Sequence, residues 1–182
     1  MTDSPRTLQE TIASVRLVAE EELERYANGA QRPLAGYAVL VSIYSTVLAT
    51  LASLVHRRGG LPERFGAGDL ALLGVATHKM SRLVTKDTVS AIVRAPFTTF
   101  AEPTGEGEVH EEVRTDTSFR HAAGELLTCP FCTAVWIATI LAFGLVLAPR
   151  PTRLVASILT AVASSDFLQL AYAITQRAAH GG

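Results

Sequence analysis

Charged residues are scarce in this sequence, and lysine and arginine are not in excess over aspartate and glutamate. Charged residues make up 18% of the 182 positions, and the formal net charge is −1. A nucleic-acid-binding protein needs a basic surplus to neutralise phosphates, so this composition argues against a nucleic-acid partner. Apolar residues make up 48% of the chain, and with a positive mean hydropathy this indicates a membrane protein.

The chain also has few cysteines, and residues 1–33 contain no long apolar run. Two cysteines are too few for a disulfide framework, so they indicate neither an oxidising nor a reducing compartment. Because residues 1–33 are polar and acidic, they do not look like a cleavable signal peptide, and we expect internal helices to drive insertion. Apolar residues recur at helical spacing from Thr7 to Asn28, which predicts an amphipathic helix outside the hydrocarbon layer. Docking on its own chain is the simpler expectation, and a binding arm for another protein is the alternative.

Three apolar runs are long enough to cross a membrane, since a helix of about 20 residues spans the hydrocarbon core. They are Leu34–Val55, Leu127–Ala148 and Leu154–Ile174. The last two are separated by Pro149–Arg153, which is too short for anything except a tight reversal. Residues 127–174 therefore predict an antiparallel transmembrane hairpin.

Residues 69–85 form a shorter apolar segment with three basic side chains, His78, Lys79 and Arg82. Wound as a helix, the segment has a face of small and polar residues opposite a face of large apolar residues. In a bilayer the first face would pack against other helices, which would make the segment a fourth crossing. The alternative is an interfacial helix that lies flat.

Four crossings would place both chain ends and residues 87–118 on one side of the membrane. That side carries more lysine and arginine than the other, so the positive-inside rule predicts cytoplasmic termini. The sequence thus predicts an all-α integral protein of the cell membrane, with three to four transmembrane helices and an amphipathic N-terminal helix.

Residues 87–118 are predicted to be soluble. Asp87 suits the N-cap of a short helix that ends at Arg94, because Pro96 stops it. Lys86 is interpreted as a charge that reaches the membrane interface. Residues 101–117 are rich in glutamate, glycine and threonine and have almost no apolar side chains, which predicts a mobile loop.

Cys129 and Cys132 flank Pro130 and Phe131 at the start of the second long apolar run. Pro130 suits the first position of a helix, so Cys129 would lie near the N-cap and both sulfurs near the positive end of the helix dipole. This position favours a reactive thiolate. The simplest interpretation is nevertheless that the cysteines are small packing residues, and a thiol–disulfide pair is the second.

A metal site is the third interpretation of the cysteine pair. Two sulfurs need further ligands, and the candidates are His121, His78 and His110, which lie at no recognised zinc spacing. The sequence shows no catalytic triad, phosphate-binding loop or pair of carboxylates with an enzyme geometry. We therefore expect no cofactor, and the sequence favours a non-enzymatic role over an enzymatic one.

Asp166 interrupts the last apolar run, about 3 Å along the axis from its midpoint at 1.5 Å per residue. An unpaired aspartate there costs about 2.5–3.5 kcal/mol on insertion scales, so it needs a partner. Gln169 shares its helix face, and the best cation in the sequence is Arg82, with His78 one turn away. A structural ion pair is the simpler interpretation, and a proton- or ion-carrying role is the alternative.

Several of these residues form a pattern that resembles the bacterial membrane proteins grouped as domain of unknown function 1360, some of which carry a sporulation-protein label. The matching pieces are Arg82-Leu83, Lys86-Asp87, the stretch from Gly124 to Cys132, Trp136, and the stretch from Ser165 to Leu168. The resemblance covers about residues 70–175, so we take 69–175 as the family core and leave residues 1–33 and 34–55 outside it. It implies a small multi-spanning membrane protein of unassigned activity, in which Arg82, Asp87, the cysteines and Asp166 belong together. Relatives often have glycine two residues after the second cysteine, where this chain has Ala134, and this departure from the family pattern argues against a very close helix contact there.

The sequence thus favours a non-enzymatic interaction or accessory protein of the membrane, in which Arg82 and Asp166 pair inside the helix bundle. Its partners would be the lipid bilayer and either another protein or a second copy of the chain. The first alternative is a membrane thiol–disulfide redox protein that uses Cys129 and Cys132. The second is an ion or proton carrier centred on Asp166.

Overall fold

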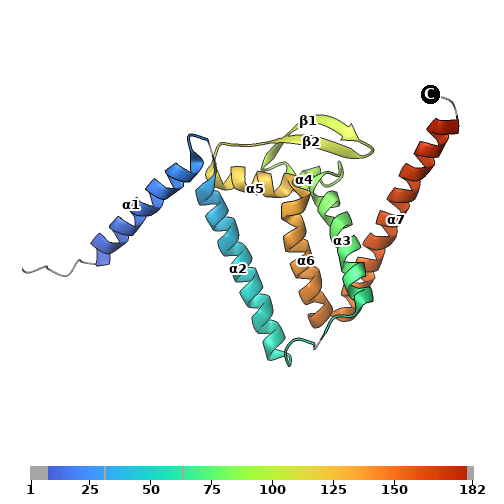
Figure 1. Ribbon diagram of the computed structural model, residues 1–182, viewed down its shortest axis with the longest axis horizontal. Helices are drawn as coiled ribbons and strands as arrows, with labels where there is room; N and C mark the ends of the chain where they lie inside the picture. Colours follow the sequence, from blue (N-terminus) through green and yellow to red (C-terminus); the bar gives the residue numbers. More distant parts are fainter. Residues whose placement is uncertain (1–7, 31, 63, 180–182) are drawn as a thin grey trace, which may run out of the picture.

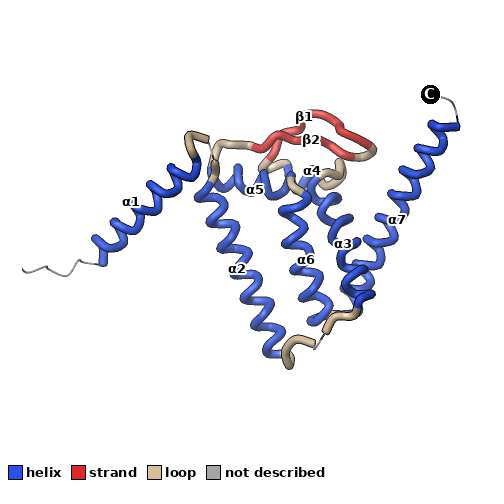
Figure 2. Tube along the Cα trace, viewed as in Figure 1, coloured by secondary structure: helices blue, strands red, loops and turns tan. Residues whose placement is uncertain are grey.

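The computed structural model describes residues 8–30, 32–62 and 64–179, and over these ranges it is mainly helical (Figure 1). The elements in chain order are α1 (Leu8–Ala27), α2 (Leu34–Arg57), α3 (Ala67–Thr85), α4 (Ala91–Arg94), β1 (Thr98–Gly105), β2 (Glu108–Val113), α5 (Ser118–Thr128), α6 (Pro130–Leu147) and α7 (Pro149–Ala179). The all-α prediction therefore fits most of the chain, with the β1–β2 hairpin as the exception (Figure 2).

Three helices are long and apolar enough to cross a membrane: α2, α6 and α7. They correspond to the three apolar runs of the sequence. Most of their surface is not covered by the rest of the chain, as expected of helices whose solvent is lipid. These helices indicate a membrane-embedded protein.

Helices α2, α3, α6 and α7 run alongside one another, and the hairpin, α4 and α5 lie across one end of them (Figures 1 and 2). We call this end the capped end. The start of α2 lies at this end, and α7 leans outward so that its C-terminal end lies on the same side of the molecule, apart from the hairpin, whereas the α2–α3 connection and the α6–α7 turn lie at the opposite end (Figure 1). Helix α3 packs against both α6 and α7, so it stands among them rather than lying across them.

A buried apolar cluster joins α3, α6 and α7. Its fully buried alanines, Ala76 on α3 and Ala156 on α7, are small residues of the kind that let helices approach closely in membranes. The remaining buried members are Leu73, Leu141, Leu145 and Leu159. The same three helices carry most of the candidate polar residues.

The predicted reversal at Pro149–Arg153 is wrong, because these residues form the first turn of α7. A proline in the first turn of a helix loses no hydrogen bond, and its fixed φ angle suits the helix. The chain therefore turns at Ala148 alone. Helix α6 also begins later than the predicted span, at Pro130, because Cys129 separates it from α5.

The predicted mobile loop at 101–117 is also wrong, since residues 98–113 form an antiparallel hairpin with two register irregularities. Along β2 the side chains alternate, with Val109 and Glu111 buried and His110 and Glu112 exposed. Gly107 takes a positive φ of 74° at the turn. A strand with few apolar residues is ordered here because its buried carboxylate has a buried partner.

The predicted helix from Asp87 to Arg94 is shorter than expected, since α4 covers only its last four residues. Asp87 does not cap α4. Its Oδ1 accepts a hydrogen bond from the Val89 N–H at 2.9 Å, which forms a local turn. Ser90 occupies the N-cap position instead.

Helix α1 is present, but the expected docking on its own chain is not seen among the described residues. It has no buried residue, and its apolar side chains are exposed. Figure 1 shows it extending away from α2, α3, α6 and α7. The part of the predicted helix before Leu8 lies outside the described residues.

Candidate functional site

A cleft of about 700 Å³ opens between α3, α7 and the turn of the hairpin. We call it the polar cleft, because charged and amide side chains gather on all three of its walls. Its polar lining residues are His78, Lys79, Arg82, Asp87, Glu106, Glu108, Asp166 and Gln169. Six polar residues singled out in the sequence are candidates for such a site, and five of them line this cleft, namely His78, Arg82, Asp87, Asp166 and Gln169, whereas Lys86 does not.

The central ion pair of the cleft joins α3 to α7. Lys79 Nζ lies 2.7 Å from Asp166 Oδ2, and the two side chains are 18% and 44% exposed. The predicted pairing of Asp166 with Arg82 is therefore wrong. Lys79 and Arg82 are three residues apart on one helix, so they lie on neighbouring positions of the same side, and the sequence pattern could not separate them.

Arg82 instead holds the hairpin against α3. Its Nη2 lies 2.6 Å from both carboxylate oxygens of Glu108, and its Nε lies 3.1 Å from Oε1. This is a bidentate, charge-assisted contact, the strongest kind that arginine makes with a carboxylate. Lys86 contributes through its backbone, because its carbonyl accepts a hydrogen bond from the Val109 N–H at 2.9 Å.

Two further predicted residues lie on the walls of the polar cleft. The His78 ring stacks on Phe167 of α7, with ring centroids 6.3 Å apart and planes 19° apart. Gln169 Nε2 donates to Ser165 Oγ at 3.2 Å, one turn back on α7. Both residues therefore contribute polar atoms without being part of the two ion pairs.

A buried pair, Arg94 and Glu111, fixes the hairpin that forms the third wall. The Arg94 side chain is 0% exposed and that of Glu111 is 6% exposed, with Nε–Oε2 at 2.7 Å and Nη2–Oε1 at 3.0 Å. Arg94 also donates to the carbonyls of Val84 and Asp87 and to Ser90 Oγ. All five guanidinium donors are thus used, and they tie the end of α3, α4 and β2 together.

The charge balance around Glu111 keeps it ionised. Burial alone would raise the pKa of this carboxyl, but hydrogen bonds from Arg94 and Thr98 and the positive charges of Arg94 and Lys86 outweigh burial and lower the pKa below its ordinary value. Thr98 Oγ1 donates to Glu111 Oε2 at 2.9 Å. The wall of the cleft therefore rests on an ion pair that is intact at neutral pH.

The cysteine pair lies away from the polar cleft, at the junction of α5 and α6. As predicted, Cys129 is the N-cap of α6 and Pro130 occupies its first turn. Cys129 Sγ accepts from the Cys132 N–H at 3.3 Å and lies 2.7 Å from Cys132 Sγ, with both thiols free. Cys129 is half-buried and Cys132 is exposed.

The proposed metal ligands do not gather around this pair. His121 Nε2 lies 3.4 Å from Glu125 Oε1 on α5, and Glu125 also accepts from the Tyr37 hydroxyl of α2. In the described part of the chain, no group of three or more histidine, cysteine, aspartate or glutamate side chains could hold a metal ion. His78 lies in the polar cleft and His110 is exposed on β2.

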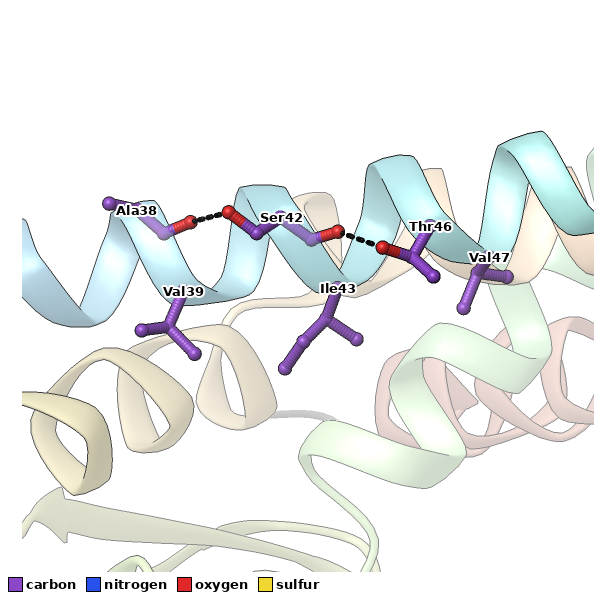
Figure 3. Close-up of a pocket in the computed structure, with 6 residues that line it drawn as sticks. All are labelled: Ala38, Val39, Ser42, Ile43, Thr46 and Val47. Carbon is purple, nitrogen blue, oxygen red and sulfur yellow. Dashed lines mark hydrogen bonds between the residues drawn. The ribbon is translucent and has the colours of Figure 1, made fainter.

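A second hollow, of about 450 Å³, follows the surface of α2. Its six lining residues all come from that helix (Figure 3). The hydroxyl hydrogens of Ser42 and Thr46 are already donated to carbonyls one turn back, at 2.7 and 2.8 Å (Figure 3). Because these donors are used within the helix, the hollow offers a weaker polar site than the cleft.

Sequence reasoning missed Lys79, Glu106 and Glu108 as members of the site. The two glutamates were assigned to a solvated loop, and only the fold of the hairpin brings them beside α3 and α7. Residues 109–113 read Val-His-Glu-Glu-Val, and because the covered face of this strand carries Glu111, the sequence lacks the apolar–polar alternation that predicts a strand.

Residues 72–172 match the family described as protein of unknown function, DUF1360. The matched range contains α6, most of α3 and α7, the hairpin and the cysteine pair, whereas α1 and α2 lie outside it. The family resemblance expected from the sequence is confirmed. No curated protein and no solved structure matches the chain.

Proposed function

The chain belongs to the DUF1360 family, and from that premise we propose that it is an accessory protein of the membrane that binds a small, positively charged ligand in the polar cleft. The observation that carries the proposal is the cleft itself, which is walled by two separate helices and the hairpin and lined by paired and unpaired charges. Its volume of about 700 Å³ falls in the range of about 300–1,000 Å³ that is typical of small-ligand sites.

In this proposal α3 crosses the bilayer together with α2, α6 and α7. A span with three fully charged side chains is costly unless each charge has a partner. Every Asp, Lys or Arg of α3 has one: the pairs are Asp69–Arg153, Lys79–Asp166 and Arg82–Glu108. The packing of α3 along α6 and α7 also favours a crossing over a flat interfacial position.

Four crossings place the capped end of the molecule on one side of the membrane with both termini. That side carries more lysine and arginine than the opposite end, so the positive-inside rule assigns it to the cytoplasm. At 1.5 Å per residue, Lys79 lies about 18 Å along α3 from its start at the opposite end. The polar cleft then lies in the cytoplasmic half of the membrane and opens toward the cytoplasm.

The charges of the cleft favour a cation. Four carboxylates line it against two fully charged cations, Lys79 and Arg82, and both cations are already paired. Asp87 and Glu106 have no basic partner among the described residues. An anion would have to displace a carboxylate, whereas an ammonium or guanidinium group adds to carboxylates that are in excess.

The test is a thermal-stability titration of the full chain in lipid nanodiscs. The probes are 1,5-diaminopentane, 5-aminopentan-1-ol and 1,5-pentanediol, which have the same length and carry two, one and no positive charges. A ligand that binds the folded state alone stabilises it by about 2.7 kcal/mol at one hundred times its Kd. At constant ionic strength we expect stabilisation to decrease in the order diamine, amino alcohol, diol.

A matched pair of variants locates the effect. Glu106→Gln removes a cleft carboxylate that is in no ion pair among the described residues, and it should weaken diamine stabilisation. Glu112→Gln makes the same chemical change on the same hairpin outside the cleft, and it should leave the titration unchanged. Equal effects of diamine and diol, or equal effects of the two variants, would overturn the proposal.

A further inference from the structure

We propose that Cys129 and Cys132 form a thiol–disulfide exchange site at the capped end of α6, with Cys129 as the attacking sulfur and Cys132 as the resolving one. The site is separate from the polar cleft, and the inference does not depend on cleft binding. Its substrate class is a disulfide, in a protein or a small molecule, that reaches this end of the helices.

Hydrogen bonding distinguishes the two sulfurs. Cys129 Sγ accepts from the backbone N–H of Cys132 at 3.3 Å, and Cys132 Sγ lies 2.7 Å away as a second donor. Both donors stabilise negative charge on Cys129. Cys129 is also the N-cap of an 18-residue helix, whose dipole favours an anion at this end.

The exposure of the residues around the cysteine pair argues for thiol–disulfide exchange rather than for simple packing. Residues that pack inside the protein are covered by it, yet Cys132 is exposed and the neighbouring residue Phe131 is 87% exposed, and both lie in the first turn of α6 at the capped end rather than along the middle of the span. The two sulfurs are in contact, so they can close a disulfide without a large change in the backbone. A substrate therefore has access to the pair, and the resolving sulfur is already in place.

The exchange balances in two steps. The Cys129 thiolate attacks one sulfur of the substrate disulfide, so that a Cys129–substrate bond forms, the substrate S–S bond breaks, and the departing thiolate takes up a proton from water. The Cys132 thiol then loses its proton and attacks Cys129 Sγ, which forms the Cys129–Cys132 bond and releases the second substrate sulfur as a thiolate that is protonated. The protein dithiol is oxidised by two electrons, and the substrate disulfide is reduced to two thiols.

The test uses oxidised glutathione as the probe and the full chain in nanodiscs at neutral pH, with products followed by intact-protein mass spectrometry. Cys132→Ser keeps a hydroxyl donor beside Cys129, and we expect its remaining cysteine to form the glutathione mixed disulfide at least tenfold faster than that of Cys129→Ser. The less exposed sulfur should thus be the faster one. In SDS-denatured protein the two variants should react at equal rates, which assigns the difference to the fold.

The unsubstituted chain provides a measurement that does not depend on either variant. It should lose two hydrogens and retain no glutathione, because Cys132 resolves the mixed disulfide. Retention of glutathione on both cysteines, or equal or reversed rates in the two folded variants, would overturn the proposal. The double variant Cys129→Ser, Cys132→Ser should keep its stabilisation by 1,5-diaminopentane, so failure of this proposal and failure of cleft binding are distinguishable.

Discussion

Replacing Glu111 with alanine would leave Arg94 as a buried guanidinium without a counter-charge. Arg94 is fully buried, and two of its five donors point at the Glu111 carboxylate, at 2.7 and 3.0 Å. The other three donors bind the carbonyls of Val84 and Asp87 and the hydroxyl of Ser90, so the guanidinium cannot turn to water without breaking the connection between α3 and α4. The change therefore weakens the contacts that attach the hairpin to α3 and α4.

The expected cost follows from the burial of the pair. Removing one partner of a buried, hydrogen-bonded ion pair costs about 3–5 kcal/mol, because the remaining charge stays desolvated. Replacing both partners by apolar residues of similar size is far less costly. We therefore expect Glu111→Ala to destabilise the hairpin by about 3–5 kcal/mol, and the double variant Arg94→Met, Glu111→Leu to recover most of that loss.

Hydrogen–deuterium exchange of the hairpin amides measures this directly in the full chain. The Val109 N–H donates to the Lys86 carbonyl and the Arg114 N–H donates to the Phe97 carbonyl, both at 2.9 Å. Exchange of these two amides therefore reports on detachment of the hairpin. A cost of about 3–5 kcal/mol corresponds to roughly 10²- to 10³-fold faster exchange or more, at 1.4 kcal/mol per tenfold. Glu112→Ala, exposed on the same strand, should change exchange by less than about threefold.

Two results would refute this reasoning about the buried pair. One is a change of less than about threefold in Glu111→Ala, which would mean that the carboxylate is not needed to hold the hairpin. The other is a double variant as unstable as the single one, which would assign the effect to side-chain packing rather than to an unpaired charge.

Three further predictions concern pH, close packing and the cleft ion pair. The pKa of Glu111 is lowered in the folded chain, so the unfolded state binds its proton first as pH falls. Protection of the hairpin amides, taken as the ratio of the intrinsic to the observed exchange rate, should be constant above about pH 5 and decrease below it, and Glu111→Gln should lose this contribution. Gly36→Ala places a Cβ against the backbone of α5 and should lower stability by about 1–3 kcal/mol in thermal unfolding, whereas Gly74→Ala, with nothing within 4 Å, should be neutral or slightly stabilising. Asp166→Asn leaves Lys79 unpaired at a half-exposed site and should cost on the order of 1 kcal/mol, measured in the same way, with partial recovery when Lys79→Gln is added.

The sequence predicted the long helices because hydrophobic length is a local property. An uncharged run of the required length needs no tertiary contact to identify it, and α2, α6 and α7 follow the three apolar runs. The ends of the helices were harder to predict where a residue suits both a turn and a helix. Pro149 and Pro151 suit a loop between helices and the first turn of a helix equally well, and only the structure shows that α7 begins there.

The sequence predicted which residues belong to the candidate site better than it predicted which of them form ion pairs. Asp166 was identified because a carboxylate in an apolar helix needs a partner, and that reasoning requires only one segment. The identity of the partner depends on the rotation of α3 relative to α7, which the sequence does not specify. Lys79 rather than Arg82 faces Asp166, and Arg82 is free to bind Glu108 of the hairpin.

The hairpin could not be predicted from composition, because its stability comes from distant residues. Glu111 is buried on a mostly polar strand, and its partner Arg94 lies before β1 on α4. The hairpin also needs Gly124 on α5, where a Cβ would overlap the Val113 side chain. Because these stabilising contacts come from residues outside the strands, residues 101–117 show no periodic pattern that would predict a hairpin.

The central claim is that α3 crosses the membrane and so places the polar cleft at one face. It is tested by single cysteines at Arg64, Thr104 and Arg150 in a Cys129→Ala, Cys132→Ala background, labelled in intact cells with a membrane-impermeant maleimide. The four-crossing arrangement predicts that Arg64→Cys and Arg150→Cys are labelled from outside and that Thr104→Cys is labelled only after permeabilisation. Labelling of Arg64→Cys and Thr104→Cys from the same side would contradict it, because α3 would then not cross.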